Sequence, residues 1–306
     1  MKHIQELPTV TVALSAYNEE KNILNFLKSV LKQNENNFRI DKIVVYSDGS
    51  DDKTEEVIES LKSKRIFVVS DKDRLGKSSR LNQIYQSLSS DFLVQSDADV
   101  IFSHPNVIEN LIKPLIDDNS VGMCGGNPCP TEGKTFIERA VNCTFSAYLD
   151  LRKTVRGGNN VFSVDGRLLA FRKSLVKKIK VPSTMIANDR YTYFCCLREK
   201  FTYKFVESAV VLFKSPNNLT DQIRQNTRFL AAKIRMTNFF PEALVKKEQS
   251  IPFNKLLITY SKQFFTHPIM CLFIFFVNRY CQIAAIFKER KMTAKWSIAV
   301  STKILK

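Results

Sequence analysis

Short apolar runs alternate with longer polar, helix-like stretches through the first hundred residues, and this rhythm constrains the fold more than any other feature of the chain. The runs are four to six residues long, with little alternation of apolar and polar positions. Such runs are typical of strands that are buried on both faces of a parallel sheet. The pattern therefore predicts a doubly wound, mostly parallel α/β sheet. The expected strands are residues 9–15, 42–47, 65–70 and 91–97, and the expected crossover helices are residues 19–33, 53–62 and 76–89.

The later part of the chain continues in mixed elements and then becomes helical. A turn cluster at residues 215–218 separates the two sections. We therefore expect a domain of residues 8–215 and a helical C-terminal region of residues 216–306. The expected elements are a long helix at 134–154, a strand-turn-strand passage at 161–174, a helix at 188–200, a strand at 203–213 and a helix at 219–240.

The chain is strongly basic, with 46 Lys and Arg, 30 Asp and Glu, and a formal net charge of +16. This excess indicates a polyanionic neighbour, such as nucleic acid, an anionic membrane or a phosphorylated substrate. Half of it lies in residues 251–306, which carry nine Lys and Arg and one Glu. A basic nucleic-acid- or membrane-binding protein without catalysis is one interpretation. However, we find no zinc finger, RNP-like aromatic motif or clear helix-turn-helix signature, so we expect no nucleic-acid partner.

Histidines and cysteines offer little chemistry in this sequence. None of the three histidines, His3, His104 and His267, has a motif partner, which disfavours a His-dependent triad. The seven cysteines form no CxxC pair and are odd in number, which argues against a zinc site and a disulfide framework and favours a reducing cytosol. Residues 1–10 contain no apolar signal region, so we expect no secretory or transit peptide.

Acid–base chemistry must therefore come from carboxylates, and several of them follow predicted strands. Ligands of doubly wound sheets bind at the carboxyl ends of the strands, where Asp48, Asp97 and Asp99 lie. Asp97 and Asp99 could converge on a hard cation, which prefers oxygen ligands. We interpret this pattern as a nucleotide-phosphate and metal site. The alternative is that the polar residues of these loops only make turns and helix caps.

Five motifs follow one another along the chain. They are VALSAYNEEKNI at 12–23, IVVYSDGSDDKT at 43–54, Gly76-Lys77 with Leu81-Asn82, Asp97-Ala98-Asp99, and VDGRLLAFRKS at 164–174 followed by Asn188-Asp189. In this order they resemble the motifs of family 2 glycosyltransferases of the GT-A fold, over roughly residues 9–230. The resemblance implies a Rossmann-like, mostly parallel sheet flanked by helices. It also implies an inverting, metal-dependent enzyme that moves a sugar from a nucleotide diphosphate sugar to a lipid-linked or polysaccharide acceptor.

The resemblance assigns the donor side of the site residue by residue. Lys77 and Asp97 would help to hold the ribose and the diphosphate, and Asp99, with Asp97, would ligate Mn²⁺ or Mg²⁺. The nucleotide-base pocket would be formed by Ala16, Tyr17, Glu19 and Asp48.

On the acceptor side, the resemblance places the general base at Asp189, which would deprotonate the acceptor hydroxyl. One base and no covalent nucleophile imply single displacement with inversion. Gln225, Arg228 and Phe229 are similar to the Q-x-x-R-W signature of the membrane polysaccharide synthases of the family. There the Arg would bind the diphosphate, with a geometry that the planar guanidinium suits, and the aromatic ring would line the acceptor path. The alternative is an amphipathic helix with a solvated Arg.

The sequence departs from the family pattern at three positions. Asn188 replaces the usual acid before the base, which implies a differently tuned base or an altered acceptor. Phe229 replaces Trp, which weakens any expectation of processive transfer. Ser15 stands where Pro is common. A nucleotidyltransferase would have a similar sheet and a metal, but it usually places a Gly-rich, basic loop after the first strand, whereas this chain has residues 15–19 there.

Residues 264–287 form an apolar segment of 24 residues with one formal charge, Arg279. As a helix it would be about 36 Å long, which is enough to span a bilayer. However, Arg279 lies past the middle, and a single span would put the basic tail opposite the catalytic domain, against the positive-inside rule. We expect the segment to bind the cytoplasmic face of a membrane, either in the interface or as a re-entrant hairpin. A soluble core helix is the alternative.

Overall fold

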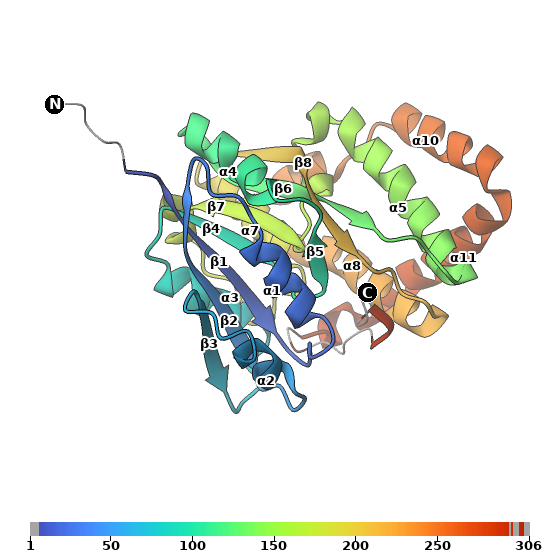
Figure 1. Cartoon of the computed structure of the whole chain (residues 1–306). Helices are drawn as coiled ribbons and strands as arrows, with labels where there is room; N and C mark the ends of the chain where they lie inside the picture. The colour runs from blue at the N-terminus through green and yellow to red at the C-terminus, as the bar shows by residue number, and fades with distance from the viewer. Residues whose placement is uncertain (1–5, 294, 296–299, 303–306) are drawn as a thin grey trace.

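A computed structural model describes residues 6–293, 295 and 300–302 of the chain (Figure 1). His3 and part of the basic tail, residues 294, 296–299 and 303–306, lie outside the described residues. Within them, eight strands form one sheet in the order β3-β2-β1-β4-β7-β6-β8-β5. The strands are β1 (Thr9–Ala16), β2 (Arg39–Asp48), β3 (Ile66–Asp71), β4 (Phe92–Ser96), β5 (Val100–Phe102), β6 (Val121–Pro130), β7 (Leu168–Arg172) and β8 (Thr202–Phe213).

The sheet is mostly parallel, which confirms the predicted fold class. Strands β3, β2, β1 and β4 run parallel to one another, and β6 pairs parallel with β8. Strand β7 is antiparallel to both β4 and β6, and β5 is antiparallel to β8. The carboxyl ends of β1, β2 and β4 therefore meet at one edge of the sheet, and the polar loops follow them there.

Helices cover both faces of the sheet and create two apolar cores. Along β1, Val12 and Leu14 pack in the core that includes α1 and α4, whereas Ala13 packs in the core that includes α3 and α7. This alternation follows from the period of two in a strand. The helices of the first section are α1 (Ile23–Leu31), α2 (Thr54–Glu59), α3 (Lys77–Ser87), α4 (Val107–Asp117), α5 (Phe136–Thr154), α6 (Lys173–Val176) and α7 (Asn188–Arg198).

Two expectations for local structure were wrong. Strand β3 is not buried on both faces, because it is the edge strand and Phe67 and Val69 stay exposed while Ile66 and Val68 pack inward. Residues 161–163 form a 3₁₀ turn rather than a strand. The side chain of Asn160 explains this turn, since its Oδ1 accepts from the Phe162 N–H at 2.9 Å and its Nδ2 donates to the carbonyls of Arg152 and Val155.

The C-terminal section is helical, as expected, but its apolar segment is not one helix. Helix α10 ends at Thr266, and Pro268 begins α11 because proline lacks an N–H and suits the first turn of a helix. The expected segment 264–287 therefore crosses this break. The helices are α8 (Leu219–Arg235), α9 (Glu242–Gln249), α10 (Phe253–Thr266) and α11 (Pro268–Lys288).

Helix α11 packs lengthwise against the body of the protein. Its buried residues, Ile274, Val277, Cys281 and Ala285, recur at helical spacing and form one face. Asn278 on the same helix accepts a hydrogen bond of 2.5 Å from the Asn226 amide of α8. In Figure 1, α5, α10 and α11 gather at one side of the molecule, away from β3.

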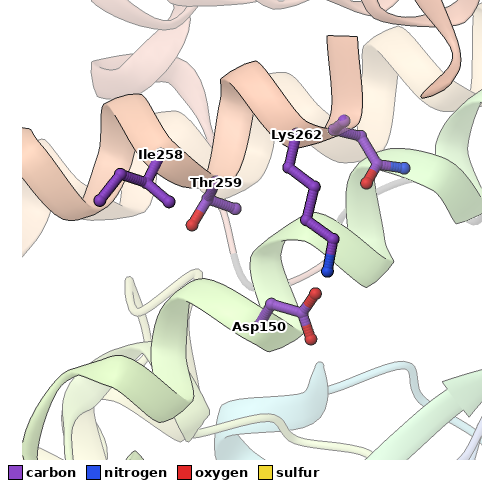
Figure 2. A pocket seen from close by; sticks show the side chains of 5 residues that line it. Asp150, Ile258, Thr259 and Lys262 are labelled. Carbon is purple, nitrogen blue, oxygen red and sulfur yellow. The ribbon is translucent and has the colours of Figure 1, made fainter. Parts of the chain in front are cut away.

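Helix α10 contacts α5 through polar groups. Gln263 donates from Nε2 to the Cys143 sulfur at 2.8 Å, and Lys255 donates to the Thr154 carbonyl. Figure 2 shows Lys262 extending from α10 toward the Asp150 carboxylate of α5, beside a cavity of about 280 Å³. No residue of α10 is buried, and large apolar side chains of this helix, such as Phe253 and Phe265, are exposed.

Candidate active-site cleft

A cleft of about 750 Å³ lies at the carboxyl ends of β1, β2 and β4 and continues between α5, α8, α10 and α11. The structure brings nearly all of the predicted site residues to it, from segments that lie far apart in the sequence. Those that line the cleft are Tyr17, Glu19, Asp48, Lys77, Asp97, Asp99, Asp189, Gln225, Arg228 and Phe229.

Ala16 is the exception among the predicted site residues. Its neighbours Ser15 and Tyr17 line the cleft, but the Ala16 side chain is buried in the core that includes α1. Successive side chains of a strand point to opposite faces, so the Ala16 side chain faces away from the cleft. If Ala16 contributes to a nucleotide-base pocket, as expected from the sequence, only its backbone can do so.

Asp48 is buried and has several partners within the protein. Its carboxylate accepts from the backbone N–H groups of Leu75 and Gly76, with Leu75 N at 2.8 Å from Oδ1, and it pairs with Arg80 Nε at 2.8 Å. These bonds fix the loop before α3, which carries Arg74. The Arg74 guanidinium lies 4.0 Å from the centroid of the Tyr17 ring.

Lys77, the first residue of α3, forms an ion pair with Asp97, which follows β4. Asp97 and Asp99 both line the cleft and offer carboxylate oxygens, which suit Mn²⁺ or Mg²⁺. No group of three or more His, Cys, Asp or Glu suited to a metal ion occurs among the residues that the structure describes. The two carboxylates thus fit a site in which diphosphate oxygens and water complete the coordination.

Gly166 marks the point where the donor and acceptor sides meet. A β carbon at this residue would lie 3.8 Å from Asp189 Cβ, 3.8 Å from Lys77 Nζ and 4.0 Å from Asp97 Oδ2. All three residues therefore lie around the same small volume, although they come from α3, the loop after β4 and α7.

Asp189 lies in the first turn of α7. Burial raises the pKa of its carboxyl above the ordinary value, and the negative charge of Asp165 adds to this effect, whereas the positive charges of Arg190 and Lys77 oppose it. A raised pKa brings a carboxylate closer to the range in which it can accept a proton near neutral pH. The geometry and the charge of this residue therefore suit a general base.

Asn188, which departs from the family pattern, is a buried contact between α7 and α3. Its Oδ1 lies 2.9 Å from the Ser78 hydroxyl, which also lies 3.1 Å from the Met185 carbonyl. Both Asn188 and Ser78 are almost fully buried. A neutral amide suits this position because a carboxylate would bury a charge beside a hydroxyl that has one proton.

Helix α8 presents Gln225, Arg228 and Phe229 to the cleft. The Arg228 guanidinium lies 5.3 Å from the Phe229 ring centroid. Burial lowers the pKa of Arg228, and the negative charges of Asp189 and Asp97 oppose that shift. Arg228 therefore lies near Asp189 and Asp97 in the cleft.

Sequence reasoning assigned no role to several basic residues of the cleft. Arg167 pairs with Asp165 at 2.9 Å and lies 3.7 Å above the Phe213 ring. Arg167 belongs to the motif at 164–174, so the sequence could have indicated that it lies in the site. No sequence motif indicated a role for Arg74, Arg190 or Lys233. They reach the cleft only through the packing of the segments that carry them.

Comparison with known proteins identifies a matching family. Residues 11–180 match the profile described as glycosyl transferase family 2. The poly-beta-1,6-N-acetyl-D-glucosamine synthase of Staphylococcus aureus is 25% identical over 252 residues, which are 80% of this chain and 60% of the relative. The same enzyme of Staphylococcus epidermidis is 21% identical over 248 residues, or 79% of this chain and 59% of the relative. The chain thus spans about 60% of the length of these relatives.

Solved structures share the fold. A mannosyltransferase from Pyrobaculum calidifontis in complex with GDP-Man and Mn²⁺ superposes with a TM-score of 0.58 at 17% identity, over 96% of this chain and 78% of that one. Glucosyl-3-phosphoglycerate synthase from Mycobacterium tuberculosis with Mg²⁺ and UDP gives a TM-score of 0.52 at 18% identity, over 77% of this chain and 81% of that one.

Proposed function

The chain belongs to glycosyl transferase family 2, and on this premise we propose that it transfers a sugar from a nucleotide diphosphate sugar to a lipid-linked or polysaccharide acceptor, with inversion. The observation that carries this proposal is the convergence of Lys77, Asp97 and Asp189 around Gly166. Around this point Lys77 would bind a phosphate group, Asp97 would bind the metal ion, and Asp189 would act as the base.

On the donor side, Tyr17 and Glu19 would line the base pocket, and the bonds of Asp48 would fix the loop that adjoins it. Lys77, Arg167 and Arg228 would face the diphosphate. Asp97 and Asp99 would hold Mn²⁺ or Mg²⁺, as the solved relatives named above contain these ions. When bound, the ion would offset negative charge that develops on the leaving diphosphate.

On the acceptor side, Asp189 would take the proton of the acceptor hydroxyl as the oxygen attacks the anomeric carbon. The bond between that carbon and the diphosphate oxygen breaks, and the nucleotide diphosphate leaves with the bonding electrons. Because the attack comes from the face opposite the leaving group, the configuration inverts. Gln225 and Phe229 would line the acceptor path.

The staphylococcal relatives support a glycan acceptor, since their name describes synthesis of a poly-N-acetylglucosamine chain. A release assay tests the proposal. Purified chain is mixed with a panel of nucleotide diphosphate sugars, with Mn²⁺, with Mg²⁺ or with chelator. We expect metal-dependent release of the nucleotide diphosphate from one donor, and loss of that release in Asp99→Ala. Absence of release and of donor binding with every donor would contradict the proposal.

We also propose that α10 and α11 hold the protein at the cytoplasmic face of a membrane. Both helices expose large apolar side chains, such as Phe265 at 84%, Phe287 at 76% and Phe253 at 75%. Exposed basic residues of the same region, such as Arg279, Lys288 and Arg290, suit anionic lipid headgroups. Exposed apolar surface of this extent favours lipid contact over water.

The packing of α11 favours a position in the membrane plane over a span. Its 21 residues are long enough to cross a bilayer, and by length and composition it is the one such helix in the described part of the chain. However, α11 lies along α8, where Cys281 Sγ contacts the Ile223 carbonyl and Asn278 accepts from the Asn226 amide. If α11 crossed the bilayer in this arrangement, the polar residues of α8 that line the cleft would enter the hydrocarbon, at a high cost.

A further inference from the structure

The cleft carries more positive charge than a donor and its metal ion would neutralise. Ten Lys and Arg side chains and six carboxylates line it. The two charges of a diphosphate diester and those of one divalent cation nearly cancel, so donor binding leaves the excess in place. The basic residues are Arg74, Lys77, Arg152, Arg167, Arg190, Arg224, Arg228, Lys233, Lys291 and Lys295.

Two of these cations lie near the candidate base. Lys77 pairs with Asp97, and Arg167 pairs with Asp165. In contrast, no salt bridge joins the side chain of Arg190 or Lys233 to a residue that the structure describes, although the charge of Arg190 acts on the neighbouring Asp189. Cations without a close ion pair in a cleft can bind an anion from solution.

Arg190 and Lys233 lie close enough to influence one another. Arg190 follows Asp189 in the first turn of α7, and Lys233 lies in the last turn of α8. Although solvent reaches Lys233, its burial in the cleft lowers its pKa to about 8, and the positive charge of Arg190 adds to this effect. Bringing two like charges together is unfavourable unless an anion joins them.

This pair adjoins the candidate base. Arg190 is the residue after Asp189 in α7, and its positive charge acts on Asp189, Lys233 and Tyr148. All four of these residues line the same cleft.

Two tyrosines complete the surroundings of the pair. Tyr148 of α5 and Tyr260 of α10 line the same cleft and lie near one another. Burial raises the pKa of both hydroxyls, so each keeps its proton at neutral pH and can donate it to an anion.

We propose that Arg190 and Lys233 form a second anion site, on the acceptor side of Asp189, which takes a phosphate group of the acceptor. The planar guanidinium of Arg190 would contact two phosphate oxygens, and Lys233 would supply a point charge. The phosphate can belong to a lipid headgroup or to a soluble phosphorylated acceptor. Its role in transfer rests on the proposed function, whereas phosphate binding itself does not.

Acetylation of Lys233 provides a residue-specific test. The intact protein is treated with acetic anhydride in a phosphate-free buffer near neutral pH, and labelled peptides are quantified by mass spectrometry. The reaction is repeated with increasing inorganic phosphate, while UDP or GDP with Mn²⁺ fills the donor side. Exposed Lys113 of α4, far from the cleft, is the internal control.

We expect phosphate to slow the labelling of Lys233 and not that of Lys113. In Arg190→Gln the phosphate concentration for half protection should rise about tenfold or more, because a charge-assisted contact is lost. In Arg190→Lys, which keeps the charge, the phosphate concentration for half protection should lie between that of the wild type and that of Arg190→Gln. Equal labelling of Lys233 with and without phosphate, or equal protection in Arg190→Gln, would overturn the site.

Vesicles separate the two sources of the phosphate. Phosphatidylcholine vesicles with and without phosphatidylglycerol replace free phosphate in a parallel series. Protection that needs phosphatidylglycerol and is lost in Arg190→Gln supports a lipid headgroup, and protection by free phosphate alone supports a soluble acceptor. Protection by vesicles that persists in Arg190→Gln is shielding by membrane and counts against the site. If Lys233 is protected but no nucleotide binds, the anion site stands and the proposed function fails.

Discussion

Lys77 Nζ and Asp189 Cβ each lie 3.8 Å from the point where a β carbon of residue 166 would stand. The first residue begins α3 and the second lies in α7, so the sheet brings together groups that are more than a hundred positions apart in the chain. A glycine at 166 leaves the space between them open to a substrate.

Position 166 should therefore tolerate a methyl side chain but not a larger one. In Gly166→Ala the new carbon meets only ordinary contacts of 3.8–4.0 Å, so we expect stability close to that of the wild type. Gly166→Leu should fill the junction and abolish nucleotide diphosphate release. Unfolding in urea and the release assay check the two effects, and equal activity of the Leu and Ala variants would refute this account of the junction.

Asp48 should matter for stability as well as for activity. Asp48→Ala leaves the fully buried Arg80 without its closest carboxylate, and breaking a buried ion pair destabilises a protein by about 3 kcal/mol. Urea unfolding measures the loss. The matched control is Asp71→Asn, which removes the half-exposed second partner of Arg80 and should cost much less, because solvent screens that pair. Equal losses in the two variants would contradict this assignment.

The pH dependence of transfer should report Asp189. A base acts only when ionised, and burial raises the pKa of Asp189 above the ordinary 3.8, so kcat/KM should fall as the pH drops through this raised value. An exposed aspartate would still be ionised in that range. Donor binding, followed over the same pH range, should lack this decline. A profile of kcat/KM that stays flat down to the ordinary value would exclude Asp189 as the base.

Apolar residues of α10 and α11 should control binding to lipid. Phe265→Glu with Phe287→Glu should weaken binding to phosphatidylcholine–phosphatidylglycerol vesicles by about a hundredfold or more, since each buried Phe contributes about 1.5–3 kcal/mol. Sedimentation with vesicles measures the change. Phe67→Glu changes an exposed Phe of β3, away from this face, and should bind like the wild type. Equal binding of all three proteins would argue against the membrane-bound orientation.

The sequence predicted the elements whose signals are local. Apolar runs predicted β1, β2 and β4, and the long helix α5 begins at Thr135 with a capping box to Glu138. The loop that carries Asp97 and Asp99 was predicted because it follows a buried strand. The order of the motifs was sufficient to predict the family.

Other features depend on tertiary contacts that no local pattern encodes. The turn at 161–163 depends on bonds from Asn160 to α5, and the exposure of Phe67 depends on the place of β3 at the edge of the sheet. Arg190 and Lys233 come together only because the first turn of α7 and the last turn of α8 lie at the same cleft. Two single residues that lie this far apart in the sequence form no periodic pattern from which their contact could be predicted.

The most direct test of the central claim compares donor binding with sugar transfer in Asp189→Asn. The substitution keeps the size of the side chain and removes its basic oxygen. We predict donor affinity close to that of the wild type, and transfer slowed by about a hundredfold or more, as is typical when a general base is lost. Transfer at the wild-type rate in a variant that binds the donor normally would contradict the assignment of Asp189 as the base.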